Sequence, residues 1–172
     1  MNEFRPLMMR SNRLLGASLV EHNLIKIETL EQANERLLEL MSAADDVPVS
    51  LLQILVVEKK AITEQQILNY LSEEMGLGVV DLTNYEQPDE VRKRIDTGAC
   101  FATWSVPFDL EEGVNFVASA FYLSPAVRSY WEGELNGPIQ WYATTTENVS
   151  EFLAKLLLDR ENMAAGEKAT AS

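Results

Sequence analysis

The sequence contains an internal repeat with a spacing of 37 residues, which limits the folds open to it. Residues 14–21 can be laid over residues 51–58. The match continues beyond them, because Ile25 falls opposite Ile62 at the same spacing. Each copy reads as a short apolar helix, a tight turn and a longer amphipathic helix. Two copies are too few for a solenoid, so the repeat predicts a small helical domain built from two helix-turn-helix units.

Local signals predict where the helices of each copy begin and end. Asn23 follows the first short helix, at a position where a left-handed residue is common and where asparagine is tolerated. Thr63 followed by Gln66 predicts a capping box at the start of the second long helix. Residues 45–48, with two aspartates and a proline, separate the copies. Helical spacing predicts apolar faces made of Leu30, Ala33, Leu37 and Met41 in the first long helix and of Ile67, Leu68, Tyr70 and Leu71 in the second.

The second half of the chain has a different pattern. Residues 79–82 form a short strand-like run. Helices are predicted to begin at Pro88 and at Ser124, and a final amphipathic helix covers residues 149–158. Segments rich in β-branched and aromatic residues predict strands over residues 101–108, 114–120 and 139–144.

These patterns predict an α+β fold: an N-terminal helical subdomain of two helix-turn-helix repeats, followed by a small α/β subdomain with a two- to three-stranded sheet. The expected division is a flexible N-terminus over residues 1–11, the tandem-repeat subdomain over 12–82, the α+β subdomain over 83–160 and a disordered tail over 161–172.

Charge and composition narrow the classes of function. The chain carries 27 acidic residues against 14 lysines and arginines, a net charge of −13. Such a surface repels nucleic acid and anionic lipid, since both require clustered basic residues. A single cysteine rules out an intramolecular disulfide, and we find neither an apolar run of membrane-spanning length nor a signal peptide. We therefore expect a cytoplasmic protein without nucleic-acid binding or direct membrane insertion.

Motifs for catalysis are missing from the sequence. There is no phosphate-binding loop and no glycine-rich dinucleotide motif after a strand. With one histidine and one cysteine, a His/Cys zinc site cannot be filled. His22 is interpreted as a helix-terminal surface residue, with a general base as the alternative, and Cys100 as a buried residue at a strand start, with a reactive thiol as the alternative. We expect no enzyme activity, no metal and no cofactor.

Two further groups of side chains have open interpretations. Trp104, Trp131 and Trp141 all fall in the second half, where they pack a core or line a groove. Residues 92–94 form the one concentrated basic spot, either a solvated helix face or a contact for an acidic partner or a phosphate. A small enzyme with a carboxylate-lined or tryptophan-lined site remains a third functional hypothesis.

The repeat also resembles a known family, the N-terminal domain of type II secretion and type IV pilus assembly ATPases (the GspE/MshE N-terminal family). The resemblance covers residues 12–158 and does not include the ATPase domain that follows in full-length members. It is carried by Leu14-Leu15-Gly16, Leu19-Val20-Glu21, Leu24-Ile25 and Leu30 in the first copy, by Leu55-Val56-Val57-Glu58, Ile62-Thr63-Glu64 and Ile67 in the second, by residues 75–82, and later by Ala102, Val106-Pro107 and residues 114–120.

Family members of the MshE type bind cyclic di-GMP through two such copies, each beginning with Arg-Leu-Gly and ending with a glutamine. In this chain the first copy has Leu14 at the arginine position and Leu37 at the glutamine position. The second has leucine, glutamine and glutamate at the arginine, glycine and glutamine positions, namely Leu51, Gln53 and Glu74. A carboxylate at the last position repels a dianionic ligand, so we expect little or no cyclic di-GMP binding.

The resemblance therefore implies a non-catalytic regulatory or protein-interaction module. In secretion ATPases this domain docks onto the cytoplasmic domain of an inner-membrane protein, so the expected partner is a secretion or pilus inner-membrane component, or an effector. The alternative is a divergent cyclic di-GMP receptor that uses Arg13, Leu15, Gly16 and Leu19.

Overall fold

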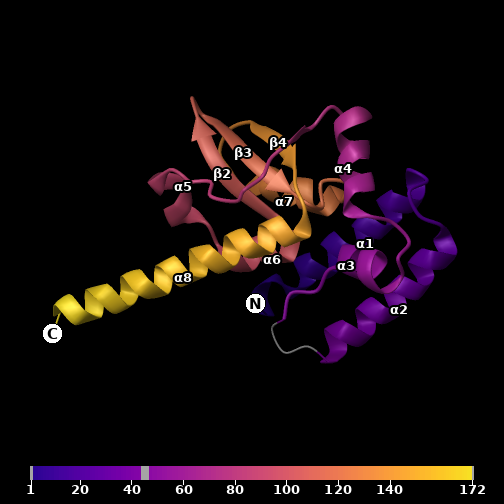
Figure 1. The fold of residues 1–172 in the computed structure, drawn as a ribbon, viewed down its shortest axis with the longest axis horizontal. Helices are drawn as coiled ribbons and strands as arrows, with labels where there is room; N and C mark the ends of the chain where they lie inside the picture. Colours follow the sequence, from indigo (N-terminus) through magenta and orange to yellow (C-terminus); the bar gives the residue numbers. More distant parts are fainter. Residues whose placement is uncertain (1, 44–46, 172) are drawn as a thin grey trace.

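The computed structural model describes residues 2–43 and 47–171 and shows an α+β fold (Figure 1). After a 3₁₀ turn, η1 (Asn2–Phe4), the helical half consists of α1 (Arg5–Glu21), α2 (Ile27–Ala43), α3 (Leu51–Gln53), the π-helix η2 (Ile54–Glu58) and α4 (Glu64–Glu73). The second half consists of β1 (Gly78–Val79), α5 (Asp89–Arg94), α6 (Thr97–Thr103), β2 (Ser105–Glu111), β3 (Val114–Ser119), α7 (Pro125–Glu134), β4 (Ile139–Ala143) and α8 (Thr146–Ala171).

The turns of the two copies are equivalent, which confirms the predicted helix-turn-helix repeat. Asn23 and Lys60, 37 residues apart, both adopt left-handed backbone, with φ angles of 59° and 50°. The helices that follow, α2 and α4, also begin 37 residues apart. The predicted capping box is present, since Thr63 Oγ1 accepts from the Gln66 amide and Gln66 Oε1 accepts from the Thr63 amide.

The helices that precede these turns differ between the copies. At the end of α1 the amide of His22 donates to the carbonyl of Ser18, four residues back. At the end of η2 the amide of Lys59 donates to the carbonyl of Ile54, five residues back. The second copy thus absorbs one extra residue in a π-helical turn, a rare conformation that is frequent at functional sites.

The sheet has the strand order β1-β4-β3-β2. β2 and β3 form an antiparallel hairpin, and its turn residues Glu112 and Gly113 both have positive φ angles, as a two-residue type I′ turn requires. β4 is parallel to both β3 and β1, and α7 makes the crossover from β3 to β4. The sheet has four strands, one more than the upper limit predicted. The additional strand is β1, which spans only two residues and joins the sheet by pairing with β4.

Helix α1 joins the two halves into one hydrophobic core. It packs against α2 and α3 on one side and against α6 and α7 on the other. The buried Asn12 amide bridges α1 to the start of α3: its Nδ2 donates to the carbonyls of Met8 and Val49, and its Oδ1 accepts from the Leu51 amide at 2.7 Å. On the other side Ser124 Oγ donates to the Ser11 carbonyl.

Three segments differ from the predicted elements. Residues 101–103 and Cys100 lie in α6 and not in a strand, because Asp96 caps this helix by accepting from the Gly98 amide. Residues 5–11, expected to be flexible, form the first turns of α1, and Met8 is buried there. Residues 161–171, expected to be a disordered tail, continue α8 beyond the body of the molecule (Figure 1). The proposed subdomain boundary at residue 82 stays a prediction.

Candidate functional site

The four residues that the resemblance marks as a ligand half-site lie on α1 but on different faces. Leu15 and Leu19 are 2% and 0% exposed and belong to the core. A Cβ atom built on Gly16 would lie 2.5 Å from Leu30 Cδ1, so the space beside this glycine is already filled. Arg13 is exposed on the outer side of the helix. The structure brings Leu15, Gly16 and Leu19 together in a packed interface and leaves Arg13 apart from them.

The other residues at the positions of the family's ligand-binding motif are buried, hydrogen-bonded or acidic. Leu37 and Leu51 are buried in the core. Gln53 donates through Nε2 to the hydroxyl of Thr146 at the start of α8. Glu74 is the exposed C-cap of α4. None of these side chains is a cation that would neutralise a phosphate, and the buried ones form part of the scaffold.

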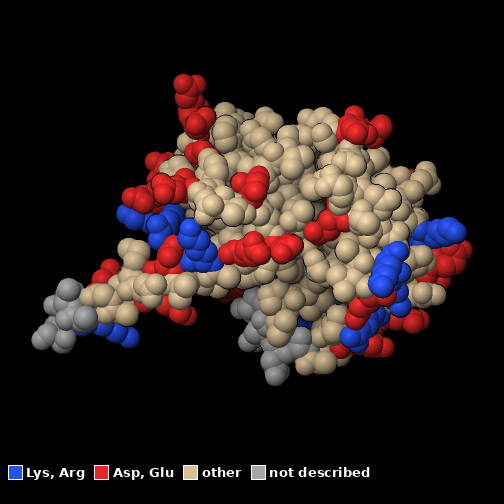
Figure 2. Space-filling model, viewed as in Figure 1, with Lys and Arg blue, Asp and Glu red and all other residues tan. Residues whose placement is uncertain are grey.

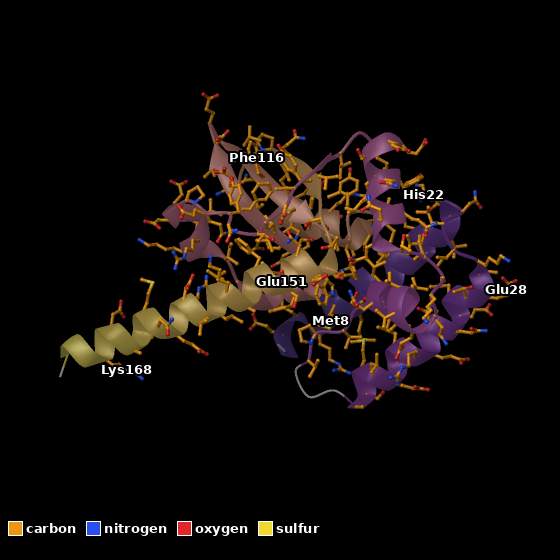
Figure 3. The ribbon with its side chains drawn as sticks, viewed as in Figure 1. Met8, His22, Glu28, Phe116, Glu151 and Lys168 are labelled. Atoms are coloured by element: carbon orange, nitrogen blue, oxygen red, sulfur yellow. The ribbon has the colours of Figure 1, made fainter. Side chains whose placement is uncertain are left out.

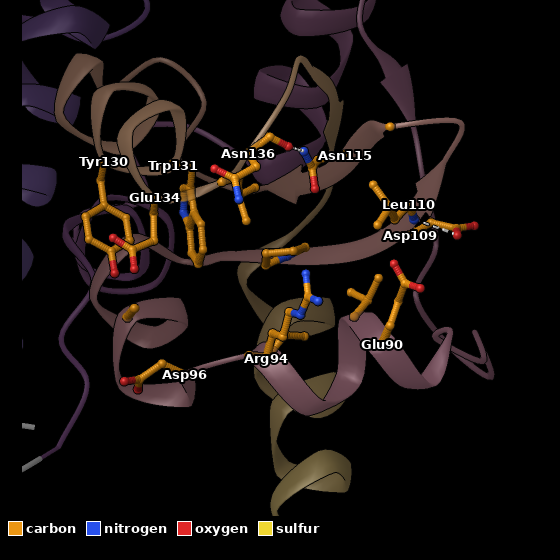
Figure 4. A pocket seen from close by; sticks show the side chains of 16 residues that line it. Glu90, Arg94, Asp96, Asp109, Leu110, Asn115, Tyr130, Trp131, Glu134 and Asn136 are labelled. Carbon is orange, nitrogen blue, oxygen red and sulfur yellow. Dashed lines mark hydrogen bonds between the residues drawn. The ribbon is translucent and has the colours of Figure 1, made fainter.

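The clearest cavity lies in the second half, between α5, α7 and the β2–β3 hairpin (Figure 4). Its volume is 410 Å³, within the range of small-molecule pockets. The Arg94 side chain extends from α5 toward the centre, and Trp131 extends toward it from α7 (Figure 4). Apolar side chains also line the cavity: Val91, Ile95, Pro107, Leu110 and Leu135.

The charges around this cavity are mostly negative. Glu90, Asp96 and Glu134 line it together with Asp109, which already accepts from the hydroxyl of Tyr85. Burial, and secondarily the charge of Glu134, raises the pKa of Tyr130 to about 12, so this phenol stays a hydrogen-bond donor at neutral pH. With the guanidinium of Arg94 among these carboxylates, the cavity is suited to binding a small zwitterionic group.

A nucleophile paired with a base is absent from the lining of this cavity. Serine, cysteine, threonine and histidine do not occur among its lining residues. Cys100 lies in the adjacent helix α6, where complete burial raises the pKa of its thiol and keeps it protonated. Among the described residues, no cluster of three or more His, Cys, Asp or Glu side chains is arranged to hold a metal ion.

The other residues singled out from the sequence have structural contacts. His22 Nδ1 lies 2.8 Å from the Ser18 carbonyl oxygen at the end of α1. In the basic run, Arg92 pairs with Asp159 of α8 at 3.8 Å, whereas Arg94 faces the cavity. Trp104 and Trp131 are buried, yet the edges of both also line surface hollows.

Sequence reasoning missed most of the cavity. Residue type alone marks Arg94 and Trp131, but it does not mark Asn115, Tyr130 and Asn136. These residues come from β3, α7 and the loop after α7, and only the crossover connection brings them together. No local spacing in the sequence signals that arrangement.

Comparison with known proteins identifies the fold. No protein-family model and no curated protein matches the sequence. Among solved structures, one of MshE with cyclic di-GMP matches with a TM-score of 0.51 and 15% identity, covering 83% of this chain and 97% of that one. Two crystal forms of the XpsE N-terminal domain match at 15% identity with TM-scores of 0.51 and 0.53; they cover 84% and 80% of this chain and 94% and 90% of theirs.

The chain shares the fold of these N-terminal domains. This agrees with the resemblance carried by the repeat, and the likeness extends through the sheet as well as the helices, since it covers at least 80% of the chain in each comparison. No helix in the described part of the chain has both the length and the apolar character needed to cross a membrane.

Proposed function

We propose that this chain is a non-catalytic regulatory module that binds a protein partner in the cytoplasm. The candidate partners are an inner-membrane component of a type II secretion or type IV pilus system, or an effector protein. The fold shared with the MshE and XpsE N-terminal domains supports this proposal.

One observation carries the proposal: the repeat keeps its hydrophobic frame, while its ligand-like positions are used for packing. Leu15, Leu19 and Leu51 are almost completely buried. Exposing any of them to a ligand would remove apolar surface from the core, which is unfavourable by roughly 25 cal/mol per Å². A scaffold of this kind is suited to presenting a surface to a protein.

The experiment mixes the purified chain with the purified cytoplasmic domains of secretion and pilus inner-membrane components from the same bacterium. We expect one of them to form a complex that calorimetry detects at micromolar concentrations, with no change in affinity when cyclic di-GMP is added. Failure to bind any such component, or any effector recovered by cross-linking in cells, would contradict the proposal.

The alternative function, a divergent cyclic di-GMP receptor, is supported by one comparison, the MshE structure with that ligand. Arg13 is exposed on α1 and is available to contact a phosphate or stack on a guanine. Leu15 and Leu19 would have to leave the core to join it. Isothermal titration decides between the two functions: submillimolar binding that disappears in Arg13→Ala would establish the receptor, and we expect no binding.

A further inference from the structure

A groove follows η2 toward the first turns of α8, and its interpretation rests on the proposed interaction function. It consists of two adjoining hollows of 490 and 320 Å³ that share Gln53, Val57 and Trp104. We call it the η2–α8 groove; Val47, Gln53, Val57, Trp104, Glu147 and Glu151 define it.

Two apolar side chains of this groove are exposed to solvent, whereas others that line it, such as Trp104, are buried. Val57 is 59% exposed and Val47 is 63% exposed. At the 37-residue spacing Val57 aligns with Val20, which is partly buried against the core, as is the neighbouring Val56 of η2. In the second copy one residue more separates the buried leucine, Leu55, from the left-handed turn residue Lys60, and Val57 is exposed on this π-helical segment.

Trp104 gives a second, independent sign of a binding surface. It has left-handed backbone, with φ and ψ both 47°, which is rare for a bulky residue. Its indole nitrogen donates to the Val49 carbonyl at 3.2 Å, so the ring is fixed where one edge lines the groove. Backbone strain of this kind concentrates at functional sites. The strained Trp104 and the π-helix η2 come from distant parts of the sequence and meet at this groove.

The charged residues that line the groove are all acidic among the described residues: Glu58, Glu64, Glu147 and Glu151. Two of them are engaged, since Glu58 pairs with Arg36 and Glu64 caps α8 by accepting from the Thr146 amide. Glu147 and Glu151 are exposed and lie four residues apart on one face of α8. Acidic side chains gather over the first turns of α8 in Figure 2, and Figure 3 labels Glu151 there.

We propose that the η2–α8 groove binds an amphipathic basic segment of the protein partner. The apolar side chains of that segment pack on Val57 and Trp104, and its lysines or arginines pair with Glu147 and Glu151. Charge complementarity selects this occupant, because an acidic or neutral segment gains nothing from an all-acidic rim on a chain of net charge −13. A second copy of the chain is disfavoured for the same reason.

The test uses three synthetic peptides of about 18 residues, a length of five helical turns. The first places leucines on one helical face and lysines on the other, the second replaces each lysine by glutamate, and the third scrambles the first. Binding to the isotope-labelled chain is followed by amide and indole chemical shifts and by calorimetry. We expect the amphipathic basic peptide to bind, with shifts centred on Val57 and the Trp104 indole, and the other two to bind at least about tenfold more weakly.

Two variants locate the binding, each with a matched control. Val57→Asp places a charge on the groove floor, and Leu158→Asp changes a residue of α8 that is similarly exposed, at 55%. The double variant Glu147→Lys with Glu151→Lys reverses the rim, and a second double variant makes the same charge changes on α2, at Glu31 and Glu35. We expect the groove variants to weaken binding about tenfold or more and the controls to change it less than about twofold.

Several outcomes would overturn the groove assignment. They are equal binding of the scrambled peptide, equal losses in the control variants, or concentration-dependent dimerisation that Val57→Asp abolishes. Binding of the chain to a secretion or pilus partner domain shows whether the groove assignment alone is wrong or the proposed function is wrong. A partner that binds wild type and Val57→Asp equally leaves the interaction function standing and removes the groove. A groove that binds the peptide, in a chain that binds no partner domain or effector, would remove the function instead.

Discussion

The two copies of the repeat share a turn but differ in the helix before it. In the first copy, α1 is regular to its end and its valine, Val20, packs against the core. In the second, η2 is π-helical and carries two valines, of which Val56 packs against the core and Val57 faces solvent. The comparison teaches that a duplicated frame can be divided between two tasks, with one copy serving as scaffold and the other presenting a surface.

A shift in register explains how the copies diverge. The buried leucines Leu19 and Leu55 lie 36 residues apart, whereas the left-handed turn residues Asn23 and Lys60 lie 37 apart. One residue more separates leucine from turn in the second copy, and η2 absorbs it. The second copy therefore keeps its core contacts, as at Leu55, and the irregular end of its helix leaves Val57 exposed on the surface.

The largest expected effects test whether the buried leucines of both copies stabilise the same core. Leu19→Ala and Leu55→Ala each remove a fully buried side chain, and each is expected to lower the free energy of unfolding by about 2–5 kcal/mol. Urea denaturation followed by circular dichroism measures both. A loss below about 1 kcal/mol at Leu55 would mean that the second copy does not share the core in solution, and the division of tasks would then need another basis.

The next effect concerns the link between the copies. Asn12→Ala removes the acceptor for the buried Leu51 amide, while the Val49 carbonyl keeps its bond from Trp104. Leaving one buried donor unpaired is expected to destabilise the chain by about 1–3 kcal/mol in the same denaturation experiment. Asn34→Ala on α2 is the control, with an expected change within about 0.5 kcal/mol. Equal effects would show that the bridge contributes nothing specific.

A smaller effect separates the two turns. Thr63→Ala breaks the capping box of α4 and is expected to lower the free energy of unfolding by about 1 kcal/mol. Lys26 holds the equivalent position before α2, where a threonine is absent. Lys26→Thr is therefore expected to raise stability by a few tenths to about 1 kcal/mol. No change in either variant would indicate that tertiary packing alone fixes both helix starts.

The sequence predicted those parts of the fold that depend on local patterns. The turn at Asn23, the box at Thr63 and the apolar face ending at Met41 all follow from residues close together in the chain. It predicted a strand-like run over residues 79–82 but not the two-residue extent of β1, which needs β4 as a partner, nor the start of α1, where Met8 is buried by residues distant in sequence. Such elements are fixed by tertiary contacts that a local window does not contain.

The candidate sites show the same limit more strongly. Family spacing marked Leu15 and Leu19 as ligand contacts, but the structure places both in the core. The groove at Val57 depends on a single residue of helical register, and a sequence alignment at a constant spacing hides that shift. Composition marks Trp104 only as one of the three tryptophans of the chain. Its left-handed backbone has no sequence signal, because the residue that ends a helix in this conformation is usually glycine or asparagine and not tryptophan.

The smallest expected change in stability gives the sharpest comparison of the copies. Val57→Ala truncates an exposed side chain and is expected to alter the free energy of unfolding by no more than about 0.5 kcal/mol. Val20→Ala truncates the partly buried side chain that aligns with Val57 at the 37-residue spacing and is expected to destabilise by about 1 kcal/mol. The order reverses for peptide binding, since only Val57→Ala is expected to lower the affinity for the amphipathic basic peptide. If Val57→Ala were instead the more destabilising change, the π-helical turn would be a packing device, and the second copy would be scaffold like the first.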